Sequence, residues 1–147
     1  MTTTHDTGMT KRNAANVRRF LEHTHSGRFD VIDELVDPHI VTHGFPCGTD
    51  PSSRAEYRAF FVDLDELWAD MAFELHALVA DADHVAARFT VTGTHAGDAM
   101  GIPATGRRVT FDGMVLYRMK DGRIAETWLH PDNTAILEQL GAFEVAA

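Results

Sequence analysis

The fold of this chain is decided by the stretch Gly93-Thr94-His95-Ala96-Gly97-Asp98-Ala99-Met100-Gly101-Ile102-Pro103-Ala104-Thr105-Gly106-Arg107-Arg108-Val109-Thr110-Phe111. It is rich in glycine and joins two runs that are patterned like strands. The run before it, residues 84–92, alternates between two sets of residues, and the run after it, residues 109–119, is apolar on both parities beyond Asp112. Period-two alternation of β-branched and aromatic residues is typical of strands, so the stretch is predicted to connect two strands by a loop.

The rest of the chain supplies helices first and strands afterwards. Helices are predicted, from apolar residues at helical spacing and from capping signals, over residues 11–27, 29–36, 53–68 and 134–140. Further strands are predicted over residues 39–43, 71–79 and 124–130. Consecutive strands joined by tight turns make an antiparallel sheet with helices on one face, which is the α+β class. The predicted architecture is a cone-shaped, curved antiparallel sheet with helices on its concave face, enclosing a pocket.

Length and composition limit the classes of protein to consider. The 147 residues suffice for one domain, which we place at residues 11–147 after a disordered tail at residues 1–10. A formal net charge of −9 argues against binding to nucleic acid or to an anionic membrane. Cys47 is the only cysteine and therefore has no internal disulfide partner, which suits a reducing compartment. The sequence starts without an apolar signal-peptide core, and we expect a cytoplasmic protein.

With this order of elements, the chain resembles the SnoaL-like polyketide cyclase family, which has the nuclear-transport-factor-2-like fold. The resemblance covers the C-terminal third densely and the rest mainly in the order of elements. The residues that carry it are Gly93-Thr94-His95 with Gly97, Met100-Gly101-Ile102-Pro103 with Thr105-Gly106-Arg107, Tyr117-Arg118, Asp121-Gly122-Arg123-Ile124, Glu126 with Trp128, Asp132, and Gln139-Leu140-Gly141.

The resemblance implies a pocket enzyme that needs no cofactor and forms a homodimer through the outer face of the sheet. Cyclases of this family close a ring by intramolecular aldol addition, in which an Asp on the last strand removes a proton next to a carbonyl. In this sequence Leu129 takes the place of that Asp, and the polar partners expected on the preceding strand fall on Gly113 and Val115. The usual aldol machinery is therefore not carried over.

Two other residues are candidates for acid–base chemistry. Asp112 interrupts an apolar strand, and in an apolar cavity its pKa would rise toward the range of a general acid or base. Alternatively, Asp112 forms a bulge with Gly113 and faces solvent. His95 continues the apolar parity of the strand before it and would serve as a proton shuttle, or it fixes the loop by bonding its backbone.

Five further residues are predicted to bind the substrate: His43, Trp128, His130, Tyr57 and Phe61. His39 and His43 share a strand face, but no third ligand appears at a telling spacing, so no metal site is predicted. His130 and Asp132 would form an acid–base pair at the rim of the cavity, or Asp132 caps the last helix. Trp128 is expected to pack in the core or in a dimer interface.

Three functions remain open at this stage. The first is a cofactor-independent enzyme of polyketide-type metabolism that cyclises or isomerises an apolar, carbonyl-containing substrate by acid–base catalysis. The second is a module that binds an apolar ligand, or that only dimerises, without catalysis. The third is epoxide hydrolysis or a hydroxylation accessory role, for which Arg88 and Asp112 would be candidates although no complete Asp–Arg–Asp cluster is visible.

Overall fold

The computed structural model describes residues 4–46 and 50–144, so Cys47 lies outside the described residues. Two helices precede the first strand, a third helix follows it, and four strands then come one after another, as predicted. The elements are α1 (Thr4–Thr24), α2 (Val31–Leu35), β1 (Val36–His43), α3 (Arg54–Leu67), β2 (Trp68–Ala80), β3 (His84–His95), β4 (Arg108–Lys120), β5 (Arg123–Pro131) and α4 (Asn133–Gln139).

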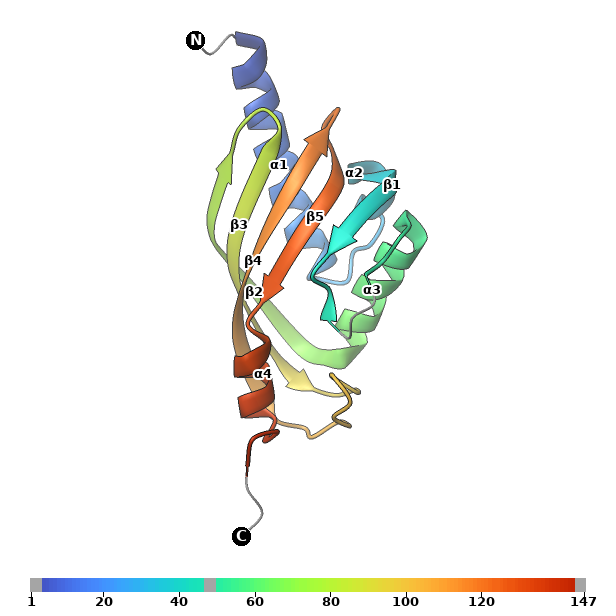
Figure 1. Ribbon diagram of the computed structural model, residues 1–147, viewed down its shortest axis with the longest axis vertical. Coiled ribbons are helices and arrows are strands. Elements are labelled where there is room, and N and C mark those ends of the chain that lie inside the picture. Colours follow the sequence, from blue (N-terminus) through green and yellow to red (C-terminus); the bar gives the residue numbers. More distant parts are fainter. Residues whose placement is uncertain (1–3, 47–49, 145–147) are drawn as a thin grey trace.

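In the described residues a five-stranded sheet forms the body of the molecule, with the strand order β1-β5-β4-β3-β2 (Figure 1). The four strands from β2 to β5 pair antiparallel, as predicted from their tight connections. β1 differs from the prediction, because it runs parallel to β5. A tight turn fixes only the direction of the strands that it joins, and β1 is separated from β5 along the chain by α3 and three strands.

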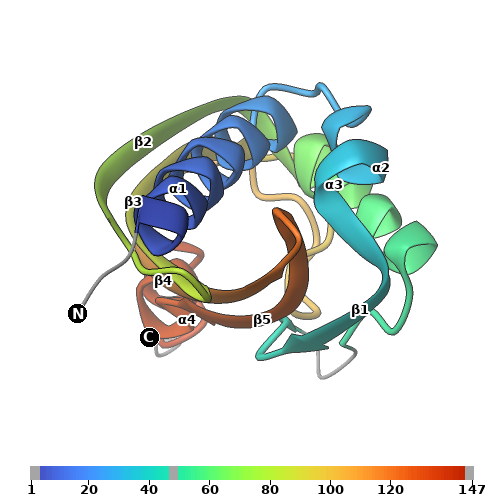
Figure 2. The same ribbon diagram turned by 90° about the horizontal axis from the view of Figure 1, so that it is seen from above.

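The sheet curls around α1, as the view from above shows (Figure 2). On β4, buried residues alternate with exposed ones, so Val109, Phe111, Val115 and Tyr117 face the helices. On α1, Val17, Phe20 and Leu21 are buried against this concave face. The core therefore lies inside the curl, between the sheet and the helices.

Helix α1 begins earlier than the sequence predicts. The expected tail at residues 1–10 is helical from Thr4 onward, which corrects the boundary at Lys11. A helix that packing has already nucleated propagates at little cost, and no proline interrupts residues 4–11. None of the helices in the described part of the chain has the length and apolar character needed to cross a membrane.

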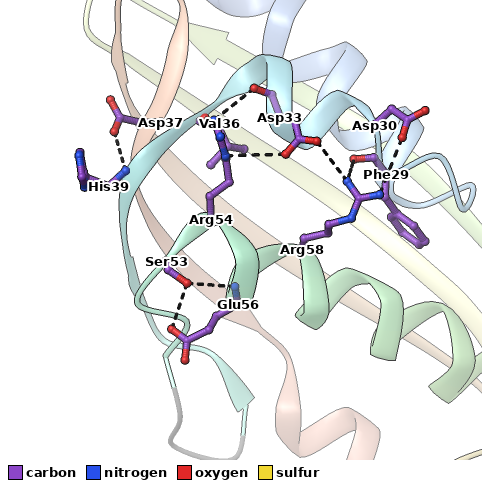
Figure 3. A network of polar contacts seen from close by, with 10 residues as sticks. All are labelled: Phe29, Asp30, Asp33, Val36, Asp37, His39, Ser53, Arg54, Glu56 and Arg58. Atoms are coloured by element: carbon purple, nitrogen blue, oxygen red, sulfur yellow. Dashed lines mark hydrogen bonds and ion pairs between the residues drawn. The ribbon is translucent and has the colours of Figure 1, made fainter.

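Polar contacts attach α3 to α2 and to the start of β1 (Figure 3). The Arg58 guanidinium lies 3.6 Å from the Asp33 carboxylate and donates to the carbonyl of Phe29. Arg54 donates to the carbonyl of Val36 at 3.2 Å. The predicted capping box at the start of α3 is present, since the Glu56 N–H donates to Ser53 Oγ at 3.1 Å. These contacts hold α3 along the open side of the curl.

Gly44 marks a close approach between the end of β1 and β5. Its φ is +81°, and a Cβ atom at this position would lie 2.2 Å from the carbonyl oxygen of Leu129. Only glycine fits there, both for conformational and for steric reasons. The chain can therefore leave β1 in close contact with β5, the strand that forms part of the cavity wall.

Candidate active site

An apolar cavity of about 260 Å³ lies between the concave face of the sheet and helices α1 and α3. Its wall is formed mostly by aliphatic and aromatic side chains of several elements. These include Leu21, Phe45, Phe60, Phe61, Leu64, Leu67, Trp68, Phe89, Val91, Phe111, Val115, Leu129 and Ile136. Such a cavity, with a few polar groups, suits a compact apolar small molecule.

A cluster of aromatic rings surrounds one end of the cavity. The ring centroid of Phe20 lies 5.9 Å from that of Tyr57 and 6.1 Å from that of Tyr117. Phe61 packs edge-on against Tyr57 at 5.0 Å. Packed rings of this kind have little rotational freedom, so the two tyrosine hydroxyls have fixed positions.

The hydroxyls of Tyr57 and Tyr117 are the main hydrogen-bond donors in this wall. Both side chains are buried and line the cavity, and burial raises the pKa of each phenol, so both carry their protons at neutral pH. Tyr117 pairs in register with Thr127 of β5. Thr127 Oγ1 lies near the Tyr57 hydroxyl, and this contact partly opposes the rise in the pKa of Tyr57. The two groups do not meet the geometry of a hydrogen bond.

His25 adds an imidazole to the same wall. It follows α1 directly and lines the cavity. Its ring stacks on Phe73 of β2, with the centroids 4.2 Å apart. Burial lowers the pKa of His25 to about 4, although the hydrogen bond to the Leu21 carbonyl opposes this change. The imidazole is therefore neutral at neutral pH.

The mouth of the cavity carries carboxylates. Asp63 of α3 and Asp98 of the loop between β3 and β4 are exposed residues that line it, next to Met100 of the same loop. A tight turn shapes this part of the loop, since Met100 and Gly101 both have positive φ and Ala99 pairs with Ile102. The loop on which the sequence argument rests thus forms part of the cavity rim.

Asp112, the first predicted catalytic residue, does not line the cavity. It is exposed on the outer face of β4, where its carboxylate accepts a hydrogen bond from Thr90 Oγ1 at 2.5 Å. The prediction that it lies in an apolar cavity is wrong. Arg88, the other residue considered for epoxide hydrolysis, is also exposed on the outer face.

His95, the second predicted catalytic residue, is buried at the end of β3 and is not among the cavity-lining residues. The backbone N–H of Thr105 donates to His95 Nδ1 at 3.1 Å, which leaves the proton of the neutral ring on Nε2. Its ring lies 5.6 Å from that of Trp68. These are the contacts of a residue that fixes the loop, the alternative weighed against a proton shuttle.

The five predicted binding residues divide between the two faces of the sheet. Tyr57 and Phe61 line the cavity. His43, Trp128 and His130 lie on the opposite, outer face, where His43 stacks on Trp128 at 5.3 Å. His43 Nε2 also lies 2.7 Å from a Glu126 oxygen, and this hydrogen bond, with a second from Arg118, lowers the pKa of Glu126.

No metal site accompanies these histidines in residues 4–46 and 50–144, where no three His, Cys, Asp or Glu side chains gather to hold an ion. Asp132 accepts from the N–H of Ala135 at 3.0 Å, so its predicted role as the cap of α4 is confirmed. Neither His130 nor Asp132 lines the cavity.

The positions of the expected aldol machinery do face the cavity, but they are apolar. Leu129 and Val115 both line it. A Cβ atom on Gly113 would lie 2.5 Å from the Phe89 ring, so a side chain at this position would require that ring to move. The polar side chains of the cavity wall lie at other positions, among them Tyr57, Tyr117 and His25.

Comparison with known proteins identifies the family. The model of the SnoaL-like polyketide cyclases matches residues 15–140. The chain belongs to the SnoaL-like polyketide cyclase family. The aklanonic acid methyl ester cyclase DnrD of Streptomyces peucetius is 29% identical over 131 residues, covering 85% of this chain and 88% of the relative.

Solved structures agree with this SnoaL-like assignment. IdmH of Streptomyces antibioticus is 31% identical and superposes with a TM-score of 0.74, covering 88% of this chain and 98% of IdmH. A SnoaL-like polyketide cyclase of Agrobacterium tumefaciens is 30% identical with a TM-score of 0.74, covering 86% and 95% of the two chains. The predicted α+β architecture with its curved sheet is confirmed.

Sequence reasoning missed two cavity residues. His25 lies four residues after Leu21 and eight after Val17, so helical spacing places it on the buried stripe of α1. Tyr117 shares the parity of Val109 and Val115 on β4, a signal that also places Asp112 on the other face. Both signals were available in the sequence.

Proposed function

We propose that this protein cyclises or isomerises an apolar, carbonyl-containing substrate of polyketide type by acid–base catalysis in the cavity, without a bound cofactor. Membership of the SnoaL-like polyketide cyclase family and the similarity to an aklanonic acid methyl ester cyclase support the reaction class. The apolar wall supports the substrate class.

The observation that carries this proposal is the pair of buried tyrosines, Tyr57 and Tyr117, that line a mainly apolar cavity. When a carboxylate that lines the cavity, Asp63 or Asp98, takes the proton from the carbon next to a carbonyl, negative charge develops on the carbonyl oxygen. A fixed O–H donor stabilises that charge strongly in a site from which water is excluded. Because burial raises the pKa of both phenols, they keep their protons and act as donors throughout.

Replacing Tyr57 by Phe tests the proposal. The variant keeps the ring that packs against Phe20 and Phe61 and removes only the hydroxyl. With aklanonic acid methyl ester as the assay substrate, we expect kcat to fall by about 10²–10³-fold with a small change in KM. Ring closure is measured by chromatography, which separates the cyclised product from the uncyclised ester. Equal turnover by Tyr57→Phe and wild type contradicts the assignment of this hydroxyl.

A non-catalytic ligand-binding module is the second candidate, and one observation favours it. Leu129 and Val115 place aliphatic side chains where a cyclase of this family carries polar groups. The decisive result would be that wild type binds the ester without converting it, whereas DnrD converts it in the same assay. This result would refute the enzymatic proposal and support the ligand-binding module.

The outer face of the sheet supports a further proposal, that two copies of this chain associate. Apolar residues are exposed there, among them Met114 and Leu116 of β4 and Val41 of β1. Leu116 lies beside Trp128 of β5, which is itself only partly buried. We call Val41, Met114, Leu116 and Trp128 the outer patch. Covering it with a second copy agrees with the homodimer that the family resemblance implies.

A further inference from the structure

His25 is held in one orientation by its neighbours. Its ring stacks on Phe73 with an interplanar angle of 23° and packs edge-on against Phe61, with the centroids 5.8 Å apart. The ring is confined between α1, β2 and α3, which supply these contacts. Its two nitrogens therefore have fixed directions, one toward the helix and one away from it.

The hydrogen bond to the helix determines which nitrogen carries the proton. His25 Nδ1 lies 2.8 Å from the carbonyl oxygen of Leu21. A carbonyl oxygen only accepts, so Nδ1 must be the donor and hold the ring proton. Because the buried ring is neutral at neutral pH, Nε2 carries a free lone pair and is an acceptor.

No described residue donates a hydrogen bond to that acceptor. Nε2 has no hydrogen-bond partner in residues 4–46 and 50–144, and it is not sealed off as His95 Nε2 is. The ring lines the cavity, so its free edge is open to a ligand there. An acceptor in an apolar site loses its hydrogen bond to water unless a ligand supplies a donor.

The cavity favours a flat, aromatic ligand as the source of that donor. Aromatic side chains from four elements form its wall, among them Phe60, Phe61, Trp68 and Phe89. An O–H group is the donor that fits, since a neutral hydroxyl on an aromatic ring enters an apolar cavity at a lower desolvation cost than a charged ammonium. The exposed carboxylates at the mouth, Asp63 and Asp98, also disfavour an anionic ligand.

We propose that the cavity selects aromatic ligands that carry a hydroxyl group, and that this hydroxyl donates a hydrogen bond to Nε2 of His25. His25 is thus a specificity-determining residue that binds the substrate through a hydroxyl other than the reacting carbonyl. The inference rests on the proposed function only in taking this cavity as the substrate site, and it names a class of substrate for it.

A pair of matched probes tests the inference without an activity assay. 2-Naphthol presents a hydroxyl, and 2-methoxynaphthalene has the same ring system with the donor removed. We expect wild type to bind 2-naphthol at least about tenfold more tightly, measured by titration calorimetry at neutral pH. In His25→Phe, which keeps an aromatic ring to stack on Phe73, the two dissociation constants become equal within about twofold.

His84→Phe is the matched control. It makes the same change of residue type at the start of β3, on a side chain that does not line the cavity, and it should retain the preference of wild type. If His25→Phe does not fold, nitrogen-15 spectra of wild type replace it. The Nε2 resonance of His25 should then shift on addition of 2-naphthol and stay in place with 2-methoxynaphthalene.

Two outcomes overturn the inference: equal affinity of wild type for both probes, or a preference that persists in His25→Phe. A preference that depends on His25 in a protein that does not cyclise the ester leaves the inference standing and refutes the proposed reaction. If the protein cyclises the ester but shows no preference between the probes, the proposed reaction stands and the inference about His25 is refuted. The two proposals therefore fail separately.

Discussion

Leu129 of β5 and Val115 of β4 are register partners, and both side chains line the cavity. The resemblance to aldol cyclases predicts polar groups at these two positions, yet the structure places an aliphatic pair there. The polar atoms lie instead on the wall formed by α3, β4 and the end of α1, where Tyr57, Tyr117 and His25 are found. The family fold is retained, while the polar side chains of the cavity lie at positions other than those that the resemblance implies.

Asp112→Asn should leave turnover within about twofold of wild type. The carboxylate lies on the outer face and contacts Thr90, so its charge is screened from the cavity by water and by the sheet. The measurement is kcat with the same ester that is used for Tyr57→Phe. A loss of about 10²-fold or more, the effect of removing a general acid or base, would restore Asp112 as a catalytic residue.

Gly44→Ala should lower the free energy of unfolding by about 1–3 kcal/mol or more, because the strained φ adds to a clash with the Leu129 carbonyl. Gly101→Ala is the control, since Gly101 has a nearly identical φ of +82° with no atom within 4 Å of an added Cβ. Urea denaturation of both variants separates the two effects. Equal losses in both would show that the close approach to β5 costs nothing.

Acid should destabilise wild type more than His25→Phe. The pKa of His25 is about 4 in the folded protein and 6.5 in the unfolded chain. The unfolded chain therefore binds a proton that the folded protein does not, and stability falls as pH drops from 6.5 toward 4. The contribution reaches about 3 kcal/mol. Urea denaturation at pH 7 and pH 4.5 measures the difference between the two proteins, in which shared carboxylate effects cancel. An equal change in the free energy of unfolding between the two pH values in wild type and His25→Phe would contradict this prediction.

Leu116→Glu should weaken self-association through the outer patch by at least about tenfold, because it would place an unpaired charge in a buried contact. Phe143→Glu is the control, as Phe143 is an exposed apolar residue that follows α4 and is not part of the sheet. Analytical ultracentrifugation over a range of concentrations gives the dissociation constant of each variant. A wild-type protein that stays monomeric at high concentration refutes the dimer.

The strands were predictable because their residues alternate, but the outer patch concealed which face of β4 is buried. Met114 and Leu116 are exposed and apolar, so residues 109–119 read as apolar on both parities. Because the alternation is hidden, the sequence does not show that Asp112 lies on the outer face of β4. A sequence records that a residue is apolar, but not whether the core or a partner covers it.

The site was less predictable than the fold, because its polar groups depend on contacts between distant elements. Tyr57 and Phe61 were found from the helical stripe of α3. The role of His25 depends on Phe73, which comes from a strand almost fifty residues later in the sequence. Histidines 43 and 130 were placed at the cavity although they lie on the outer face, since alternation gives two faces without saying which one is inside.

The parallel pairing of β1 with β5 also constrains how the protein assembles. Among the strands that the structure describes, β1 lies at the edge of the sheet and pairs with β5. Thr42 can therefore pair with Thr127 only after β5 has been synthesised. Contacts between such distant segments form late, after the loop between them has been closed. During synthesis, β5 must therefore leave the ribosome before the sheet can close. A chain truncated before β5 would expose an unpaired strand instead of enclosing a cavity.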